Sequence, residues 1–289
     1  MDVNRPSSSG IAFPNDIKTR PSPAAKRDYF STPERIILCR HGERFDHANP
    51  TWSRTATRPH DPPLTEDGRK MAKKLGEYLK AVRFIDPANV VVFSSPLQRC
   101  VQTAHHILEG LCCDDAKLLK HMKIFVEETL VEGSYWMNKD LKKNRQIRLQ
   151  EATPLPVYHN RESLAQHVSP LVQPKPFVDG GFGAVNIQWN PVLSELVEEI
   201  DISQRCLNAA HECARCPGLV GKILVLVSHG QASVEWYNAL SFKSLQMTPP
   251  YTAFAELRPA VVDINEDAKG HMMVVWHPQM EPFSTPHTE

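Results

Sequence analysis

The sequence lacks several features that would place it in a specialised class of protein. Its formal net charge is zero, with 33 basic and 33 acidic side chains, so no overall field attracts it to nucleic acid or to an anionic membrane. No apolar run approaches the roughly 20 residues that span a bilayer, and the first residues lack the apolar core of a signal peptide. The composition, 41% hydrophobic and 23% charged, is ordinary for a globular protein. We therefore expect a chain that binds neither nucleic acid nor membrane.

Metal-ligand spacing is also missing from the sequence. Among its seven cysteines, only Cys206, Cys213 and Cys216 cluster, and no second cysteine or histidine pair follows them at zinc-finger spacing. The adjacent His105 and His106 would point about 100° apart on a helix, which does not favour a shared metal. We expect free thiols, no metal, no cofactor and a reducing compartment, either the cytoplasm or the nucleus.

The chain divides into a tail and a domain. Residues 1–32 are rich in proline, serine and charge, which predicts a flexible N-terminal tail. In residues 33–289, short apolar runs alternate with segments of helical periodicity. This alternation predicts an α/β three-layer sandwich with a mostly parallel central sheet and helices on both faces. The expected strands are 36–39, 90–93, 123–127, 222–228, 260–264 and 272–276.

The helix starts are predicted from capping residues. Thr65 is a good N-cap for one helix, and Ser95 followed by Pro96 predicts the start of a second. A third helix is expected at about 192–213. Between about 133 and 190 regular periodicity fades, and we interpret this segment as an insertion that forms a lid. Its basic residues at 139–148 are expected to be a solvated helix face.

Polar side chains follow the predicted strands at the points where these strands end. In an open α/β sheet, ligands bind outside the carboxyl ends of the strands. We therefore expect one site that collects residues from four strand ends: Arg40, His41 and Arg44 after the first, Arg99 after the second, Glu128 and Glu132 after the third, and His229 after the fourth.

These residue types fit phosphoryl transfer. Arginine binds a tetrahedral oxyanion through paired donors, and its charge does not titrate. A histidine among arginines has a lowered pKa, and a neutral imidazole is a nucleophile. A carboxylic acid can protonate the leaving oxygen. Because phosphoryl transfer depends mainly on positioning and charge stabilisation, the set predicts a phosphohistidine mechanism that needs no metal.

Five motifs in this order resemble those of the histidine phosphatase superfamily, which has the phosphoglycerate-mutase-like fold. They are CRHGER at 39–44, DPPLTEDG at 61–68, SSPLQRCVQTA at 94–104, LVEG at 130–133 and VSHG at 227–230. The resemblance covers roughly residue 33 to the C-terminus. Within the superfamily, the local sequence is most similar to the suppressor-of-T-cell-receptor-signalling and ecdysteroid-phosphate phosphatase group.

The resemblance implies a phosphoric monoester hydrolase and a role for each site residue. His41 matches the phosphorylated nucleophile and His229 the second histidine of the pocket. Glu132 matches the acid, with Glu128 as the competing choice. The phosphate-binding arginines would be Arg40, Arg44 and Arg99.

The substrate implied by the resemblance is a phosphorylated small molecule or a phosphoprotein, and a homodimer is compatible with it. The mutase signature after RHG is missing, which disfavours mutase activity. Gly230 stands where acid phosphatases of the other branch carry aspartate after the distal histidine, which disfavours that branch. The alternative is a non-catalytic or weakly active scaffold of the same fold that binds a partner through the pocket or the lid.

Overall fold

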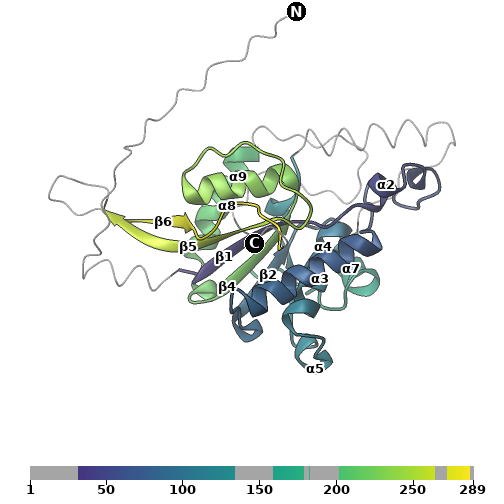
Figure 1. Ribbon diagram of the computed structural model, residues 1–289, viewed down its shortest axis with the longest axis horizontal. Helices are drawn as coiled ribbons and strands as arrows, with labels where there is room; N and C mark the ends of the chain where they lie inside the picture. The colour runs from purple at the N-terminus through teal and green to yellow at the C-terminus, as the bar shows by residue number, and fades with distance from the viewer. Residues whose placement is uncertain (1–31, 134–158, 179–181, 183–201, 264–271, 287–289) are drawn as a thin grey trace, which may run out of the picture.

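The computed structural model describes residues 32–133, 159–178, 182, 202–263 and 272–286 (Figure 1). The predicted N-terminal tail, apart from residue 32, lies outside the described residues. So do the basic residues at 139–148 and most of the predicted lid.

The described strands form one six-stranded sheet in the order β3-β2-β4-β1-β5-β6. The first four strands in this order pair in parallel, and β5 and β6 extend the sheet antiparallel on the β1 side. The sheet is therefore mostly parallel, as predicted. The strands are β1 Arg35–Arg40, β2 Val90–Ser94, β3 Ile124–Val126, β4 Ile223–Ser228, β5 Phe254–Asp263 and β6 Met272–Pro278.

Helices cover both faces of the sheet (Figure 1). Alternate residues of β1 point to opposite faces, so Ile37 packs in a core with α3 and α4, and Ile36 packs in a second core with α8 and α9. This arrangement confirms the predicted three-layer sandwich. The helices are α2 Phe45–Ala48, α3 Glu66–Ala81, α4 Gln98–Leu111, α5 Ala116–Leu119, α7 Arg161–His167, α8 Ile202–Arg215 and α9 Gly230–Ser241, with 3-10 turns at Trp52–Arg54, Pro87–Asn89, Glu128–Leu130 and Pro217–Leu219.

The start of α3 agrees with the sequence, whereas the start of α4 does not. The Thr65 hydroxyl accepts a hydrogen bond from the Gly68 amide and caps α3 as predicted. The predicted cap of α4 at Ser95 is wrong, because this helix begins at Gln98 and its N-cap residue is Leu97. The Ser95 hydroxyl instead lies 2.8 Å from the His229 ring.

The strand β5 begins six residues before the predicted 260, because a buried carboxylate interrupts the apolar pattern. Glu256 is fully buried within β5. Its carboxylate pairs with Arg83 at 2.5 Å, Arg258 at 3.3 Å and Arg35 at 3.6 Å. A charged residue in a sequence usually indicates an exposed loop. Glu256 can instead be buried in a strand because three guanidinium groups compensate its charge.

Part of the segment that we interpreted as a lid belongs to the sandwich. Leu164, Leu171 and Val172 join the core beneath α4, and Val172 forms a β-bridge with Ile124 of β3. Residues 159–178 therefore border the β3 edge of the sheet. Apart from residues 133 and 182, the remainder of the predicted lid at 133–190 lies outside the described residues.

The described residues contain no helix with the length and apolar character needed to cross a membrane. All seven cysteines carry free thiols. Cys206 and Cys213, two members of the predicted cysteine cluster, are fully buried in the core beneath α8 and α9. Their burial agrees with thiols that act as small apolar side chains.

Candidate active site

The carboxyl ends of β1, β2 and β4 lie side by side because β4 is the central strand of the three. The register pairs Arg40 with Ser228 and Ser94 with Val227. Just beyond the strands, the His41 amide donates to the Ser228 carbonyl at 2.9 Å. Residues from three distant parts of the sequence thus meet at one edge of the sheet.

His41 and His229 face each other in this cluster. Their ring centroids are 5.3 Å apart with an interplanar angle of 67°, and the two residues are 3% and 0% exposed. The His41 Nδ1 lies 2.7 Å from the Gly42 carbonyl oxygen, which can only accept a hydrogen bond. Nδ1 therefore carries the proton and Nε2 presents its lone pair.

Burial lowers the pKa of His41 well below its usual range, and the positive charges of Arg99, Arg40 and Arg44 lower it further. Desolvation and like charge both disfavour the imidazolium form. At neutral pH His41 is thus a neutral base with an available nitrogen. This state is the one that the sequence predicts for a nucleophile.

His229 has protein partners at both ring nitrogens. The Arg99 Nη2 donates to Nδ1 at 3.2 Å, so Nε2 carries the proton and donates to the Ser95 hydroxyl at 2.8 Å. Its pKa is also well below the usual range, because of burial first and then the nearby Arg99 charge. His229 is therefore neutral and held in one orientation.

The three predicted arginines differ in their burial and in how many of their donor atoms already have protein partners. Arg99 is 4% exposed, and its Nε and Nη1 make no hydrogen bond within the described residues. The Arg40 guanidinium lies 4.4 Å from the centre of the Tyr251 ring and donates to the Pro249 carbonyl. Arg44 forms a two-point ion pair with Asp46, at 3.0 and 2.8 Å. Arg99 thus has the most buried donors available for an anion.

Glu132, and not Glu128, lies among these cations. Burial raises the pKa of Glu132, and the charges of Arg99 and Arg40 partly oppose this rise. The Glu128 carboxylate instead pairs with Arg161 at 2.5 Å. The structure therefore places Glu132 near Arg99 and Arg40, while its role as a proton donor stays a prediction.

A buried arginine positions the loop that carries Glu132. Arg205 of α8 is 1% exposed, and its Nη1 donates to the carbonyls of Thr129 and Val131 at 2.6 and 2.9 Å. The Ser228 hydroxyl donates to the Leu130 carbonyl at 2.7 Å. The loop is thus held from both the helix layer and the end of β4.

Close backbone contact explains the glycine of the RHG motif. A Cβ atom on Gly42 would lie 2.6 Å from the Gly68 carbonyl oxygen, which is closer than any real Cβ contact. The Gly42 amide donates to the Thr103 hydroxyl at 3.0 Å. The segment after His41 is therefore fixed between the start of α3 and the first turns of α4.

Sequence reasoning missed Asp61. This residue is fully buried; its carboxylate accepts from the Gln98 amide at 3.0 Å and lies 3.7 Å from the Arg99 Nη1. Burial raises the pKa of Asp61 to about 7, although the Arg99 charge opposes the rise. The motif DPPLTEDG contained this residue, but only the folded chain shows that it lies against Arg99.

Tyr251 was also missed. Its ring centroid lies 5.8 Å from that of His41, and its hydroxyl is 2.6 Å from the His47 Nδ1. It lies in an irregular segment just before β5, where no periodic pattern indicates a role. It completes one wall of the cluster and supports Arg40 through a cation–π contact.

Known proteins similar to this chain agree with the sequence motifs. Residues 36–150 match the family model described as the histidine phosphatase superfamily (branch 1). The ubiquitin-associated and SH3 domain-containing proteins B and A of Mus musculus are each 35% identical to it over 130 residues. These matches cover 35% of this chain and 19% of each relative. The chain is therefore similar to only a part of these longer proteins.

The fold is similar to that of a solved enzyme. The crystal structure of the ecdysone phosphate phosphatase from Bombix mori in complex with tungstate superposes with a TM-score of 0.56 and 19% identity. The similarity covers 87% of this chain and 93% of that one. At this low sequence identity it supports the fold alone. The motifs, the family-model match over residues 36–150 and the shared fold all support the histidine phosphatase superfamily.

Proposed function

We propose that this chain is a phosphatase that hydrolyses phosphomonoesters through a phosphohistidine intermediate on His41, without a metal. One observation carries the proposal: a neutral imidazole, with its Nε2 lone pair available, lies beside the charges of three arginines. This combination suits attack on a phosphoryl group, because the arginines attract the dianion and keep the nucleophile unprotonated.

The phosphate would be bound mainly by Arg99 and Arg40. The Nε and Nη1 atoms of Arg99 and the Nε atom of Arg40 are buried and make no hydrogen bond within the part of the chain that the structure describes. Unsatisfied buried donors are costly, and a phosphoryl oxygen would satisfy them. Arg44 would join them when it turns from Asp46.

Two steps complete the reaction. The lone pair of His41 Nε2 attacks phosphorus, the ester P–O bond breaks, and the leaving oxygen takes a proton from Glu132. A water then attacks phosphorus and gives its proton to Glu132, the N–P bond breaks, and inorganic phosphate leaves. The raised pKa of Glu132 favours the protonated form that the first step requires.

His229 would assist by changing its protonation state. A bound dianion opposes the lowering of its pKa by the arginines. If Arg99 turns toward the phosphoryl group, the Nδ1 of His229 can take up a proton and donate to an equatorial oxygen. Ser95 would hold the ring by its other nitrogen throughout.

The organic part of the substrate has a candidate pocket beside α4. A cavity of about 310 Å³ is lined in part by Trp52, Arg58, Gln98 and His159. It borders the first turn of α4, next to Arg99 in sequence. We propose that an apolar or aromatic alcohol group of a phosphorylated small molecule or of a phosphoprotein lies there against Trp52.

The test combines kinetics with trapping of the intermediate. The full chain is assayed with p-nitrophenyl phosphate and a panel of phosphosubstrates in the presence of a chelator, and the His41→Ala variant is assayed in parallel. We expect turnover in the wild type and none in the variant. Rapid quenching should trap a phosphoenzyme that is labile to acid and stable to base, as phosphohistidine is.

A catalytically competent His41→Ala variant would overturn the nucleophile assignment. A wild type with no turnover on any substrate, which still binds vanadate, would instead support the scaffold alternative. Loss of turnover on addition of a chelator would contradict metal independence.

A further inference from the structure

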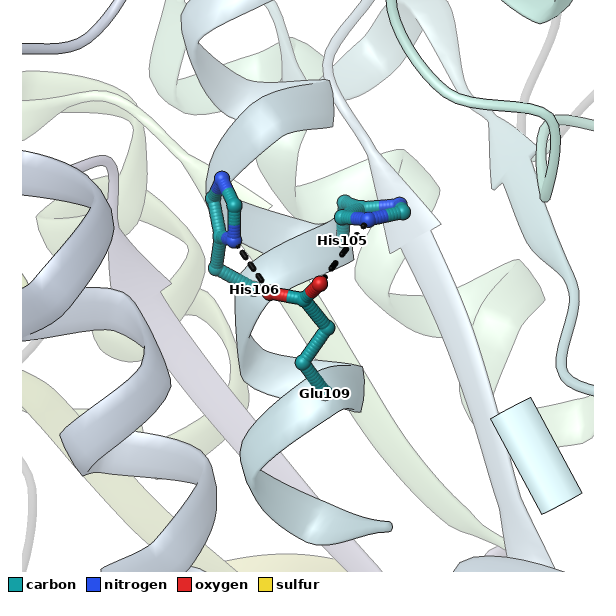
Figure 2. A group of neighbouring side chains, drawn as sticks. All are labelled: His105, His106 and Glu109. Atoms are coloured by element: carbon teal, nitrogen blue, oxygen red, sulfur yellow. Dashed lines mark hydrogen bonds and ion pairs between the residues drawn. The ribbon is translucent and has the colours of Figure 1, made fainter. Parts of the chain in front are cut away.

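A cluster of metal-ligand side chains lies on the middle of α4, outside the residues assigned to the candidate active site. Figure 2 shows the carboxylate of Glu109 between the imidazole rings of His105 and His106. The His105 Nε2 lies 3.5 Å from one carboxylate oxygen, and the His106 Nδ1 lies 2.5 Å from the other. One ligand atom from each of the three residues lies within 4.8 Å of the other two.

Helix geometry explains why these side chains converge. Glu109 follows His105 by four residues and His106 by three, and both spacings bring side chains together on a helix surface. The two histidines alone point in different directions, which is why the sequence did not suggest a metal. The carboxylate spans the angle between them.

A hydrogen bond to Ser169 orients one of the two rings. The Ser169 hydroxyl lies 2.8 Å from the His105 Nδ1 and also accepts from the Leu171 amide at 3.2 Å. Ser169 is 1% exposed, so it is a fixed partner. When the Ser169 hydroxyl accepts a hydrogen bond from the protonated Nδ1, the His105 Nε2 presents its lone pair toward Glu109. Metal-bound histidines are commonly oriented by such a second partner at the other ring nitrogen.

The distances suit a small tetrahedral ion. Zinc bonds of about 2.0–2.2 Å place tetrahedral ligand atoms roughly 3.3–3.6 Å apart. The distance from His105 Nε2 to Glu109 already fits this range, whereas the distance from His106 Nδ1 to Glu109 would have to increase. The three side chains are 21, 22 and 28% exposed, which leaves access for a water as fourth ligand. Two imidazoles and one carboxylate favour zinc-class ions over Mg²⁺ and Ca²⁺, which prefer all-oxygen sites.

We propose that His105 Nε2, His106 Nδ1 and Glu109 bind a divalent transition-metal ion of the zinc class. This site is separate from the phosphoryl chemistry, so it does not depend on the proposed function. Because an ion that binds only the folded state stabilises it by mass action, the site would strengthen α4 and its contact with the segment around Ser169.

The first test is a calorimetric titration of the full chain with Zn²⁺ after removal of metals with EDTA. We expect His106→Gln and Glu109→Gln to lose one zinc equivalent relative to the wild type. His211→Gln, which removes an exposed histidine from α8, should lose none. Ser169→Ala should keep the equivalent but bind zinc about 10-fold or more weakly, because the His105 ring loses its orientation.

The second test locates the ion directly. Crystals soaked in Zn²⁺ should give an anomalous difference peak among the three side chains, and excess Mg²⁺ should not displace it. The proposal fails if the peaks lie only elsewhere, or if His106→Gln and Glu109→Gln bind as many equivalents as the wild type. If circular dichroism shows that a variant is misfolded, the anomalous peaks in the wild-type crystal alone test the proposal.

Discussion

Arg99 occupies the centre of the candidate site because it contacts residues from separate elements. It donates to His229 and lies 3.7 Å from Asp61, and its charge lowers the pKa of both histidines. Burial is the main reason that both imidazoles are neutral, and this single guanidinium adds to the effect while it provides buried donors for an anion. Loss of this residue should affect binding more than any other single change among the arginines.

We predict that Arg99→Ala weakens inhibition by vanadate about 10- to 100-fold, the scale for losing one charged hydrogen bond worth about 1.5–3 kcal/mol. The inhibition constant in a phosphatase assay, or the dissociation constant if turnover is lost, measures this change. Arg69→Ala is the control, because Arg69 lies on α3 in an exposed ion pair with Glu66 and should leave inhibition unchanged. Equal vanadate affinity in Arg99→Ala and the wild type would contradict the assignment.

Asp61 makes the site sensitive to pH near neutrality. Its pKa in the folded chain is about 7, above the ordinary 3.8. As the pH falls through 7, Asp61 loses its negative charge and no longer neutralises Arg99. We therefore predict that a dianion that does not titrate in this range, such as sulfate, inhibits more strongly at pH 6 than at pH 8.

The Asp61→Asn variant should remove most of this pH dependence and should bind sulfate at pH 8 nearly as the wild type does at pH 6. The stability of the folded state should also increase as the pH falls. Because the folded-state pKa lies above the ordinary value, proton uptake by Asp61 stabilises the folded state as the pH falls from 7 toward 4. Parallel sulfate-inhibition profiles for the two proteins would refute the prediction.

At the scale of elements, the backbones of α3 and α4 contact each other at two glycines. A Cβ atom on Gly110 would collide with the Lys73 carbonyl, and one on Gly76 would collide with the Ile107 carbonyl. Only glycine permits this approach. The contact fixes α4, which carries Arg99 at its start, against α3, which begins near the RHG segment.

We predict that Gly110→Ala destabilises the protein by at least about 1–3 kcal/mol, the cost of overpacking a tight core. Urea unfolding followed by circular dichroism measures it. Lys70→Ala on the exposed surface of α3 should change stability by less than about 0.5 kcal/mol. A Gly110→Ala variant as stable as the wild type would mean that the helices separate without cost.

At the scale of the whole molecule, one buried charge joins distant parts of the sandwich. Glu256 of β5 pairs with Arg35 at the start of β1, with Arg83 after α3 and with Arg258 of β5. The pairs lie on the side of the sheet where the antiparallel strands begin. Removal of the Glu256 carboxylate would take this counterion from Arg83 and Arg258, and would leave Arg35 paired with Glu34.

We predict that Glu256→Leu lowers the free energy of unfolding by about 3–5 kcal/mol, the scale for breaking a buried ion pair. Activity per folded molecule should stay near the wild-type value, since Glu256 contacts no residue of the candidate site. Glu281→Gln, at an exposed position, serves as the control for chemical denaturation. An unchanged unfolding midpoint in Glu256→Leu would show that the cluster does not stabilise the fold.

The sequence by itself was sufficient to predict the layered α/β architecture, most of the strands and the candidate site residues. Buried parallel strands read as short apolar runs, and the motifs lie directly at their ends. The predicted Ser95 cap was wrong and the start of β5 was missed, because a distant imidazole and distant arginines decide what Ser95 and Glu256 do.

Only the tertiary structure decided how the site residues are paired and charged. The different charged neighbours of Glu132 and Glu128, the proximity of Asp61 to Arg99 and the convergence of two histidines on Glu109 all depend on side chains brought together by folding. Periodicity reports which face of an element is buried. The pKa of a group depends on its burial and on neighbours that are often distant in sequence. A set of metal ligands also depends on how the side chains are oriented. The linear order of residues does not contain this information.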